Sequence, residues 1–314
     1  MEGLVIKNTG NRYDVLAADG STVTCNVKGN FRLKGIRTTN PVAVGDHVTF
    51  EQPEGAENGY ITAIAPRRNY IIRRASNLSK ESHIPAANID QVALIVTLAH
   101  PATSLTFIDR LLATAEAYGV EAMLVINKTD LLVTDDDRDT LEAVTYLYRS
   151  IGYRVLHLCA TSGDGLDKLR DHLAGKITLL SGNSGVGKST IINDLLPDAR
   201  QKVAEISATH LTGMHTTTFS EMFPLPGGGF IIDTPGVKGF GTIDFDVNEV
   251  SHYFPEIFKA SEGCRYGNCT HTHEPGCEVR RQLDEHLIAQ SRYASYLSIL
   301  EDAQGGDDKY RKPY

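Results

Sequence analysis

The feature of this sequence that most constrains its fold is a glycine-rich segment in the second half of the chain. Residues Gly182–Thr190 read GNSGVGKST, which matches the phosphate-binding pattern of a glycine, four residues and then Gly-Lys-Ser. The apolar run Ile177–Leu180 precedes this segment and the helical pattern Ile191–Leu196 follows it, so the sequence predicts a strand, a phosphate loop and a helix. We expect Lys188 to reach the β- and γ-phosphates of a nucleotide and the Ser189 hydroxyl to bind Mg²⁺. The predicted nucleotide contacts in this loop are Gly182, Asn183, Ser184, Gly185, Val186, Gly187, Lys188, Ser189 and Thr190.

A second polar loop, Asn127-Lys128-Thr129-Asp130, directly follows the apolar run Ala122–Ile126. A loop at the carboxyl end of a parallel strand is where α/β folds bind ligands. The Asp130 carboxylate can accept hydrogen bonds from guanine N1–H and the exocyclic amine, which adenine does not present in that arrangement. We expect Asn127 to tie loops together and the stem of Lys128 to cover the base. Beside a phosphate loop, this motif favours guanine over adenine.

Three shorter segments complete the predicted nucleotide site. Ala160 follows another apolar run and is small enough for its backbone N–H to approach the guanine carbonyl oxygen. Asp233 ends a further strand and is predicted to hold Mg²⁺, while the Gly236 N–H is predicted to sense the γ-phosphate. The run Thr216–Thr218 offers hydroxyls for Mg²⁺, and we favour Thr217 as the ligand. An edge strand is the alternative interpretation of this threonine run.

Apolar runs and helical segments alternate around these loops, which predicts a doubly wound α/β sheet. The predicted strands are Val92–Leu98, Ala122–Ile126, Val155–Leu158, Ile177–Leu180 and Phe230–Ile232, and the predicted helices are Leu105–Tyr118, Thr140–Ser150 and Leu166–Leu173. Before this region, short β-rich runs alternate with turn residues from Gly3 to about Ile72. They indicate an OB-like β-barrel, although a split or SH3-like barrel would have a similar pattern.

A cysteine- and histidine-rich segment follows the sheet region, in a part of the chain that is otherwise predicted to be helical. Cys264, Cys269, His271 and Cys277 are spaced Cys-x4-Cys-x-His-x5-Cys. Three thiolates and one imidazole are typical of a closed, structural Zn²⁺ site with no position for a reactive water. His273 is the alternative histidine ligand, and unmetallated buried cysteines are the alternative to a metal site. We therefore expect three domains, with boundaries at 1–72, 73–243 and 244–314.

The charge of the chain is unevenly distributed. The net charge of the 314 residues is −8, but residues 1–80 hold 11 Lys or Arg and 7 Asp or Glu, which makes that segment +4 and the remainder −12. The basic residues of the first segment fall in two clusters, Lys28–Arg37 and Arg67–Lys80, each with an aromatic residue and without an acid. This pattern favours RNA binding by the barrel, with a solvated charged face as the alternative.

Composition excludes several other classes of protein. The hydrophobic fraction of 41% is too high for a disordered chain, and the longest apolar run, of about eight residues, is too short to span a membrane. The first 15 residues have no signal-peptide pattern, so we expect a cytoplasmic protein that does not bind membranes. Cys25 and Cys159 are expected to be packing residues.

The combined motifs resemble a translation-factor-related GTPase whose order is circularly permuted, because the Asn127–Asp130 loop precedes the phosphate loop. A barrel, a permuted GTPase domain and a Cys3His module together resemble the bacterial ribosome small-subunit-dependent GTPase A family, from about Leu4 to Leu300. This resemblance implies a monomer with GTP or GDP, Mg²⁺ and one Zn²⁺ per chain. It also implies contacts with ribosomal RNA, hydrolysis of GTP on the small ribosomal subunit late in its maturation, and release of the protein afterwards.

The resemblance also bears on catalysis. Val237 stands where many GTPases have a glutamine that orients the attacking water, so we expect a low intrinsic rate that the small subunit stimulates. His215, in the family's His-Thr-Thr-Thr motif, is the predicted replacement and acts with Lys188 and Thr217; an ordinary loop histidine is the alternative. Met214 departs from the basic or polar residue common in the family. Two other hypotheses remain, a GTP-regulated switch for a protein partner and an RNA-binding module with a vestigial GTPase domain.

Overall fold

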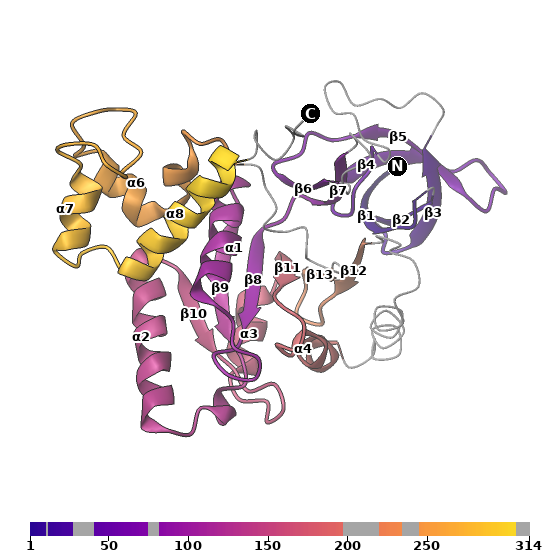
Figure 1. The fold of residues 1–314 in the computed structure, drawn as a ribbon. Coiled ribbons are helices and arrows are strands. Elements are labelled where there is room, and N and C mark those ends of the chain that lie inside the picture. The colour runs from indigo at the N-terminus through magenta and orange to yellow at the C-terminus, as the bar shows by residue number, and fades with distance from the viewer. Residues whose placement is uncertain (11, 28–40, 75–81, 197–219, 234–244, 306–314) are drawn as a thin grey trace, which may run out of the picture.

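The computed structural model describes residues 1–10, 12–27, 41–74, 82–196, 220–233 and 245–305 (Figure 1). An N-terminal barrel and a C-terminal group of helices lie at opposite sides of a central sheet. Among these residues, no helix combines the length and the apolar character needed to cross a lipid bilayer.

The barrel closes through an additional pairing between its first and fourth strands. Its strands are β1 (Glu2–Asn8), β2 (Tyr13–Ala17), β3 (Thr22–Val27), β4 (His47–Glu51) and β5 (Gly59–Ile64), in the order β1-β2-β3-β5-β4 with β4 paired back to β1. Alternate residues point inward, and Val5, Val15, Phe50 and Ile61 form a buried core. The predicted OB-like barrel is confirmed, since this five-stranded closed arrangement is that of an OB barrel.

The central sheet consists mainly of parallel strands covered by helices. In sheet order its strands are β10 (Arg154–His157), β9 (Glu121–Ile126), β8 (Gln91–Val96), β11 (Ile177–Ser181), β13 (Phe230–Asp233) and the antiparallel β12 (Ser220–Pro224). The helices are α1 (Leu105–Ala117), α2 (Asp135–Ile151), α3 (Leu166–Leu173) and α4 (Lys188–Leu195). Leu94 and Ile95 of β8 are both buried but belong to different hydrophobic clusters, so both faces of the sheet are covered. The predicted α/β architecture is confirmed.

The described elements differ from the predicted ones at several points, and strand β12 is an addition. Helix α2 begins at Asp135 instead of Thr140, because Thr134 and Asp137 form a capping box that extends the first turn. A two-stranded hairpin of β6 (Tyr70–Arg74) and β7 (Ser82–Ala87), which the sequence did not predict, connects the barrel with the central sheet.

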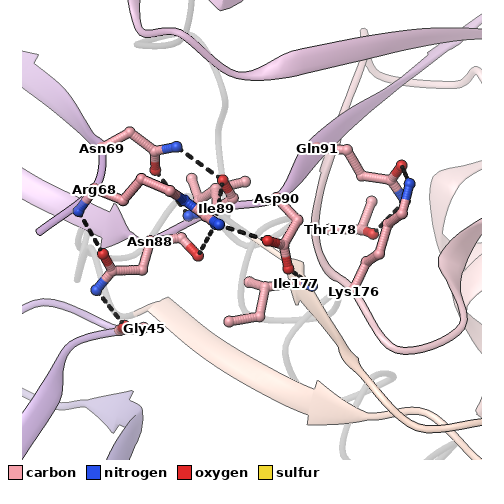
Figure 2. A network of polar contacts seen from close by, with 10 residues as sticks. All are labelled: Gly45, Arg68, Asn69, Asn88, Ile89, Asp90, Gln91, Lys176, Ile177 and Thr178. Atoms are coloured by element: carbon pink, nitrogen blue, oxygen red, sulfur yellow. Dashed lines mark hydrogen bonds and ion pairs between the residues drawn. The ribbon is translucent and has the colours of Figure 1, made fainter.

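A polar network fixes this connection (Figure 2). Asn88 Nδ2 donates to the Gly45 carbonyl of the barrel at 2.9 Å, and Asn88 Oδ1 accepts from the Arg68 N–H at 2.9 Å. The Arg68 guanidinium binds Asp90 Oδ1 at 2.7 Å, and Asp90 Oδ2 accepts from the Ile177 N–H at 2.7 Å. The barrel is therefore joined to the residues at which β8 and β11 begin.

The sheet also continues into the barrel through β12. Strand β1 pairs antiparallel with β12, with Lys7 opposite Glu221, and the two side chains form an ion pair of 3.0 Å. Eleven of the described strands thus form one hydrogen-bonded series that includes both the barrel and the central sheet, and β6 and β7 form a separate two-stranded sheet.

The C-terminal region is helical, as predicted, and packs against α1. Its elements are η4 (Val250–Tyr253), α6 (Pro255–Ser261), α7 (Glu278–Asp284) and α8 (Gln290–Gly305). Phe254, Ile257 and Tyr296 form a hydrophobic cluster that also includes Ala113 of α1. This cluster places the C-terminal helices on the outer side of the α1 layer (Figure 1).

A buried ion cluster lies in the same interface. The Arg292 side chain is 1% exposed and binds Asp109 Oδ1 of α1 at 2.8 Å and Glu256 of α6 at 2.6 Å. Tyr148 of α2 donates its hydroxyl to the same Asp109 oxygen at 2.7 Å, and the guanidinium lies 4.6 Å from the Phe254 ring centroid. Charge pairing and apolar packing together attach the C-terminal helices to the central domain.

Candidate nucleotide and metal sites

The loops predicted to bind a nucleotide lie at one edge of the central sheet. Each strand in the series β10-β9-β8-β11-β13 is parallel to its neighbours. Their carboxyl ends therefore share this edge. Asn127 directly follows β9, Gly182 follows β11, and β13 ends at Asp233, whose backbone is paired with Leu180. The permuted order of the motifs along the chain is therefore compatible with a single site in space.

The phosphate loop has a backbone that only glycine adopts readily. Gly187 has a φ of 97°, and a Cβ there would lie 2.4 Å from Asn127 Nδ2; at Gly182, with a φ of 145°, a Cβ would lie 2.1 Å from the Ile95 carbonyl oxygen. Lys188 Nζ donates to the carbonyls of Gly182 and Asn183 at 2.6 and 2.7 Å. The N-cap of α4 is Gly187, which has no side chain to bond the N–H groups of the first turn, so this end of the helix suits an anion.

Asn127 connects three of the predicted loops. Its side chain is buried, and Nδ2 donates to the Val186 carbonyl of the phosphate loop at 2.8 Å. Its Oδ1 accepts from the Ala160 N–H at 3.1 Å. One amide group thus holds the phosphate loop and the Ala160 loop against the end of β9.

The loop Asn127–Asp130 has a hydrogen-bond partner, Cys159, that was not expected from the sequence. The Cys159 thiol donates to Asp130 Oδ1 at 3.1 Å, so Cys159 is more than a packing residue. Thr129, at the start of the short helix η1 (Thr129–Leu131), donates its N–H and its hydroxyl to the Leu158 carbonyl, both at 3.2 Å. The signal that could have revealed Cys159 is its place immediately before Ala160, in a loop already assigned to the base.

Several predicted site residues lie outside the described part of the chain. These are Met214, His215, Thr216, Thr217, Thr218, Gly236 and Val237. Asp233 is described only as the last backbone position of β13. The basic segment Lys28–Arg37 is also outside the described residues.

Arg67 and Arg68, the arginines of the second basic cluster whose side chains the structure describes, both form internal ion pairs. Arg67 is almost fully buried and binds both carboxylate oxygens of Asp46 at 2.7 and 2.6 Å, and it also donates to the Pro41 carbonyl. Arg68 binds Asp90 but keeps 61% of its side chain exposed. Arg67 therefore stabilises the barrel and is not presented to a ligand.

The four predicted zinc ligands are gathered in the C-terminal region. One donor atom from each of Cys264, Cys269, His271 and Cys277 lies within 4.8 Å of all the others. His271 Nδ1 is 3.6 Å from Cys264 Sγ and 3.5 Å from Cys277 Sγ. With Zn–S of about 2.3 Å and Zn–N of about 2.0 Å, two ligands of a tetrahedral ion are separated by about 3.5–3.8 Å, so these positions fit zinc. His273 is exposed and is not part of the cluster.

The protonation of this cluster also fits a metal site. Burial raises the pKa of the Cys269 thiol to about 12 and raises that of Cys277, so these sulfurs need a nearby cation to become thiolates. Burial lowers the pKa of His271, which favours the neutral, metal-binding imidazole. The donor set and its spacing thus suit one structural ion.

The fold and the site define a class of protein, a circularly permuted GTPase of the phosphate-loop type. A family model described as RsgA GTPase matches residues 64–243, and one described as RsgA N-terminal domain matches residues 2–61. The chain belongs to the RsgA GTPase family. GTP and GDP, with Mg²⁺, are the ligands that this family membership implies.

Relatives match over the full length of the chain. The small ribosomal subunit biogenesis GTPases RsgA of Bacteroides fragilis, Phocaeicola vulgatus and Porphyromonas gingivalis are 58%, 59% and 56% identical, and each alignment covers all of both chains. The crystal structure of YjeQ from Thermotoga maritima is 30% identical with a TM-score of 0.78 and covers 97% of this chain and 98% of its own. The structure of YloQ, a circularly permuted GTPase, is 28% identical with a TM-score of 0.76 and covers 99% of this chain and 96% of its own.

Proposed function

We propose that this protein binds the small ribosomal subunit, hydrolyses GTP there, and couples hydrolysis to a late step of subunit maturation and to its own release. The observation that carries this proposal is the Asn127 side chain, which joins the phosphate and base loops into one site that suits guanine. Full-length relatives bearing the name small ribosomal subunit biogenesis GTPase support the choice of partner.

For the nucleotide, the proposed contacts are those expected from the motifs. Asp130 reads guanine, and Asn127, Lys128, Thr129 and Ala160 surround the base. Gly182–Thr190 surrounds the phosphates, with Lys188 on the β- and γ-oxygens and the Gly236 N–H at the γ-phosphate. Ser189, Thr217 and Asp233 are the proposed protein ligands of Mg²⁺, which neutralises charge on the phosphates. The position of Ser189 in the first turn of α4 supports its part in this set.

Hydrolysis needs a group that Val237 cannot supply. We assign the orientation of the attacking water to His215, next to the threonine run, and expect a low rate in the free protein. Docking on the subunit stimulates hydrolysis by acting on the segment that holds His215 and Thr217, because such segments are a common switch element in GTPases.

A structural Zn²⁺ on Cys264, Cys269, His271 and Cys277 is the proposed role of the C-terminal cluster. Its four protein ligands close the coordination shell, so the ion stabilises the fold and takes no part in hydrolysis. For the division of the chain we keep 1–72, 73–243 and 244–314. The C-terminal hydrophobic cluster, whose residues in this region begin at Phe245, supports the second boundary, and the barrel, whose last strand ends at Ile64, lies within the first segment.

We propose that the barrel binds ribosomal RNA. The protein is proposed to act as a monomer in the cytoplasm. With Arg67 engaged by Asp46, the positive charge for RNA must come from other residues, such as Lys28–Arg37 and the exposed Arg68. Fewer basic residues are therefore proposed to contact RNA than the sequence alone indicated.

Sedimentation with purified small subunits tests the proposal. The protein is expected to bind with a non-hydrolysable GTP analogue and to dissociate with GDP, and the affinity is expected to fall steeply with salt if phosphates are contacted. A shallow salt dependence would favour a protein partner. Nucleotide-independent binding would favour an RNA-binding module with a vestigial GTPase domain.

Asp130→Asn tests the selection of guanine. It is expected to shift nucleotide preference from GTP towards XTP, whereas unchanged selectivity would show that Asp130 does not recognise the base.

A further inference from the structure

A loop that belongs to none of the GTPase motifs touches two parts of the nucleotide site. This loop, 98–103, lies between β8 and α1. Its His100 carbonyl accepts a hydrogen bond from Lys128 Nζ at 2.7 Å. On its other side, Pro101 Cδ lies 3.5 Å from where a Cβ of Gly185 in the phosphate loop would be. The loop therefore contacts both the base motif and the phosphate motif.

The two ends of the loop are fastened to each other by threonines. The Thr97 N–H donates to Thr103 Oγ1 at 3.2 Å, and the Thr103 N–H donates to the Thr97 carbonyl at 2.8 Å. The Thr97 hydroxyl in turn donates to the Pro101 carbonyl. Thr97 is 0% exposed and Thr103 is 7% exposed. Water therefore does not compete for the hydrogen bonds that close the loop.

This fastening determines where His100 sits. His100 has a φ of 47°, in the left-handed region that a residue other than glycine adopts only at some cost in energy, so the closed loop must hold it there. Its carbonyl consequently has a fixed direction. Lys128, itself at a φ of 61°, extends its side chain from the end of β9 to that carbonyl.

We infer that the loop closed by Thr97 and Thr103 is a further wall of the guanine-nucleotide site, and that Thr103 is a positioning residue that acts through Lys128. The inference rests on the proposed nucleotide site, in which the stem of Lys128 covers the guanine ring. An ammonium group anchored on the His100 carbonyl holds that stem in place before the nucleotide arrives. Pre-organisation of this kind increases affinity, because less side-chain freedom is lost on binding.

The expected effect is on affinity and not on the chemical step. Thr103→Val preserves the shape of the side chain but leaves the Thr97 N–H without its acceptor. We expect it to weaken GDP and GTP binding by a similar factor, roughly five- to thirty-fold, with little change in kcat at saturating GTP. Thr103→Ser retains the hydroxyl and is expected to restore most of the affinity. Thr114→Val in α1 also removes a buried hydroxyl with a backbone hydrogen bond, in this case donated to the Arg110 carbonyl; it is the matched control and should leave affinity unchanged.

The test is a double-mutant cycle with Lys128→Met in the full-length protein, measured by GDP titration and by steady-state kinetics. If Thr103 acts through Lys128, Thr103→Val should weaken GDP binding less than about twofold in the Lys128→Met background. Full additivity of the two substitutions, or wild-type affinity of Thr103→Val, would overturn the inference. If Thr103→Val does not fold, Thr97→Val replaces it in the cycle, because it removes the hydroxyl that donates to the Pro101 carbonyl. Thr97→Ser, which retains that hydroxyl, is then its control.

The outcome also separates this inference from the proposed function. Failure of the unmodified protein to bind GDP would contradict the nucleotide site as a whole. Normal binding by the unmodified protein, a loss with Lys128→Met and no loss with Thr103→Val would contradict the role of the loop alone.

Discussion

The buried Arg292 offers the most quantitative test of how the C-terminal helices are attached. Its guanidinium compensates two carboxylates, Asp109 at 0% exposure and Glu256 at 15%. Arg292→Met keeps a long unbranched side chain but leaves both carboxylates without a cation in the interior. Removal of one partner from a buried ion pair costs about 3–5 kcal/mol, mostly because the remaining charge stays desolvated. We therefore expect α8 to open more easily by about 4 kcal/mol.

Native-state hydrogen exchange measures this opening directly, with zinc kept saturating. A change of about 4 kcal/mol corresponds to exchange of the α8 amide groups that is faster by roughly three powers of ten. Arg281→Met is the matched control, because Arg281 also pairs with two carboxylates, Glu278 and Glu285, but at the surface. It should leave the exchange of α8 unchanged. Equal effects of the two substitutions, or no effect of Arg292→Met, would show that the buried ion cluster does not hold α8 in place.

A third variant separates two effects of Arg292→Met: the loss of attraction between the ions, and the cost of leaving carboxylates buried without a cation. Combined replacement of Arg292, Asp109 and Glu256 by Met, Leu and Met removes the charges together. Buried ion pairs replaced by apolar groups of similar volume often lose no stability. The triple variant is therefore expected to recover most of the stability that Arg292→Met loses, and a further loss would show that the pairing itself is strongly favourable.

Three other predictions follow from the sites. Gly187→Ala places a Cβ 2.4 Å from Asn127 Nδ2 at a φ of 97°, so it should abolish GTP binding in a filter assay while circular dichroism stays that of a folded protein. Cys159→Val removes the donor to Asp130 Oδ1 and should weaken GDP binding by about five- to tenfold, whereas Cys159→Ser should bind as the unmodified protein does; equal affinity of all three would remove this role. Chelation of one zinc per chain should unfold mainly the C-terminal helices in calorimetry, and metal-free protein of unchanged stability would contradict the zinc site.

The motifs whose partners are local or follow a strand end could be predicted from the sequence. The phosphate loop and the Asn127 loop each follow a recognisable apolar run, and parallel strands bring their carboxyl ends to one edge, so their meeting follows from the fold class. The start of α2 could also have been found, because Thr134 and Asp137 have capping-box spacing.

Partners far apart in the chain could not be predicted in this way. The sequence places Arg67 in a basic cluster that favours RNA binding, because no acid lies near it in the chain, but the barrel brings Asp46 to it from 21 residues away. Arg292 and Asp109 are separated by 183 residues, and neither has a local pattern that marks it as an interface residue. Charge patterning along a sequence therefore overestimates the surface charge that remains for a ligand.

The proposed function predicts that the small ribosomal subunit stimulates hydrolysis of GTP by this protein. The most direct measurement is steady-state release of phosphate from GTP by the full-length protein, alone, with purified small subunits and with purified large subunits. A low rate for the free protein and a rate raised many-fold by small subunits alone is the predicted result. Equal rates under the three conditions would contradict stimulation by the small subunit.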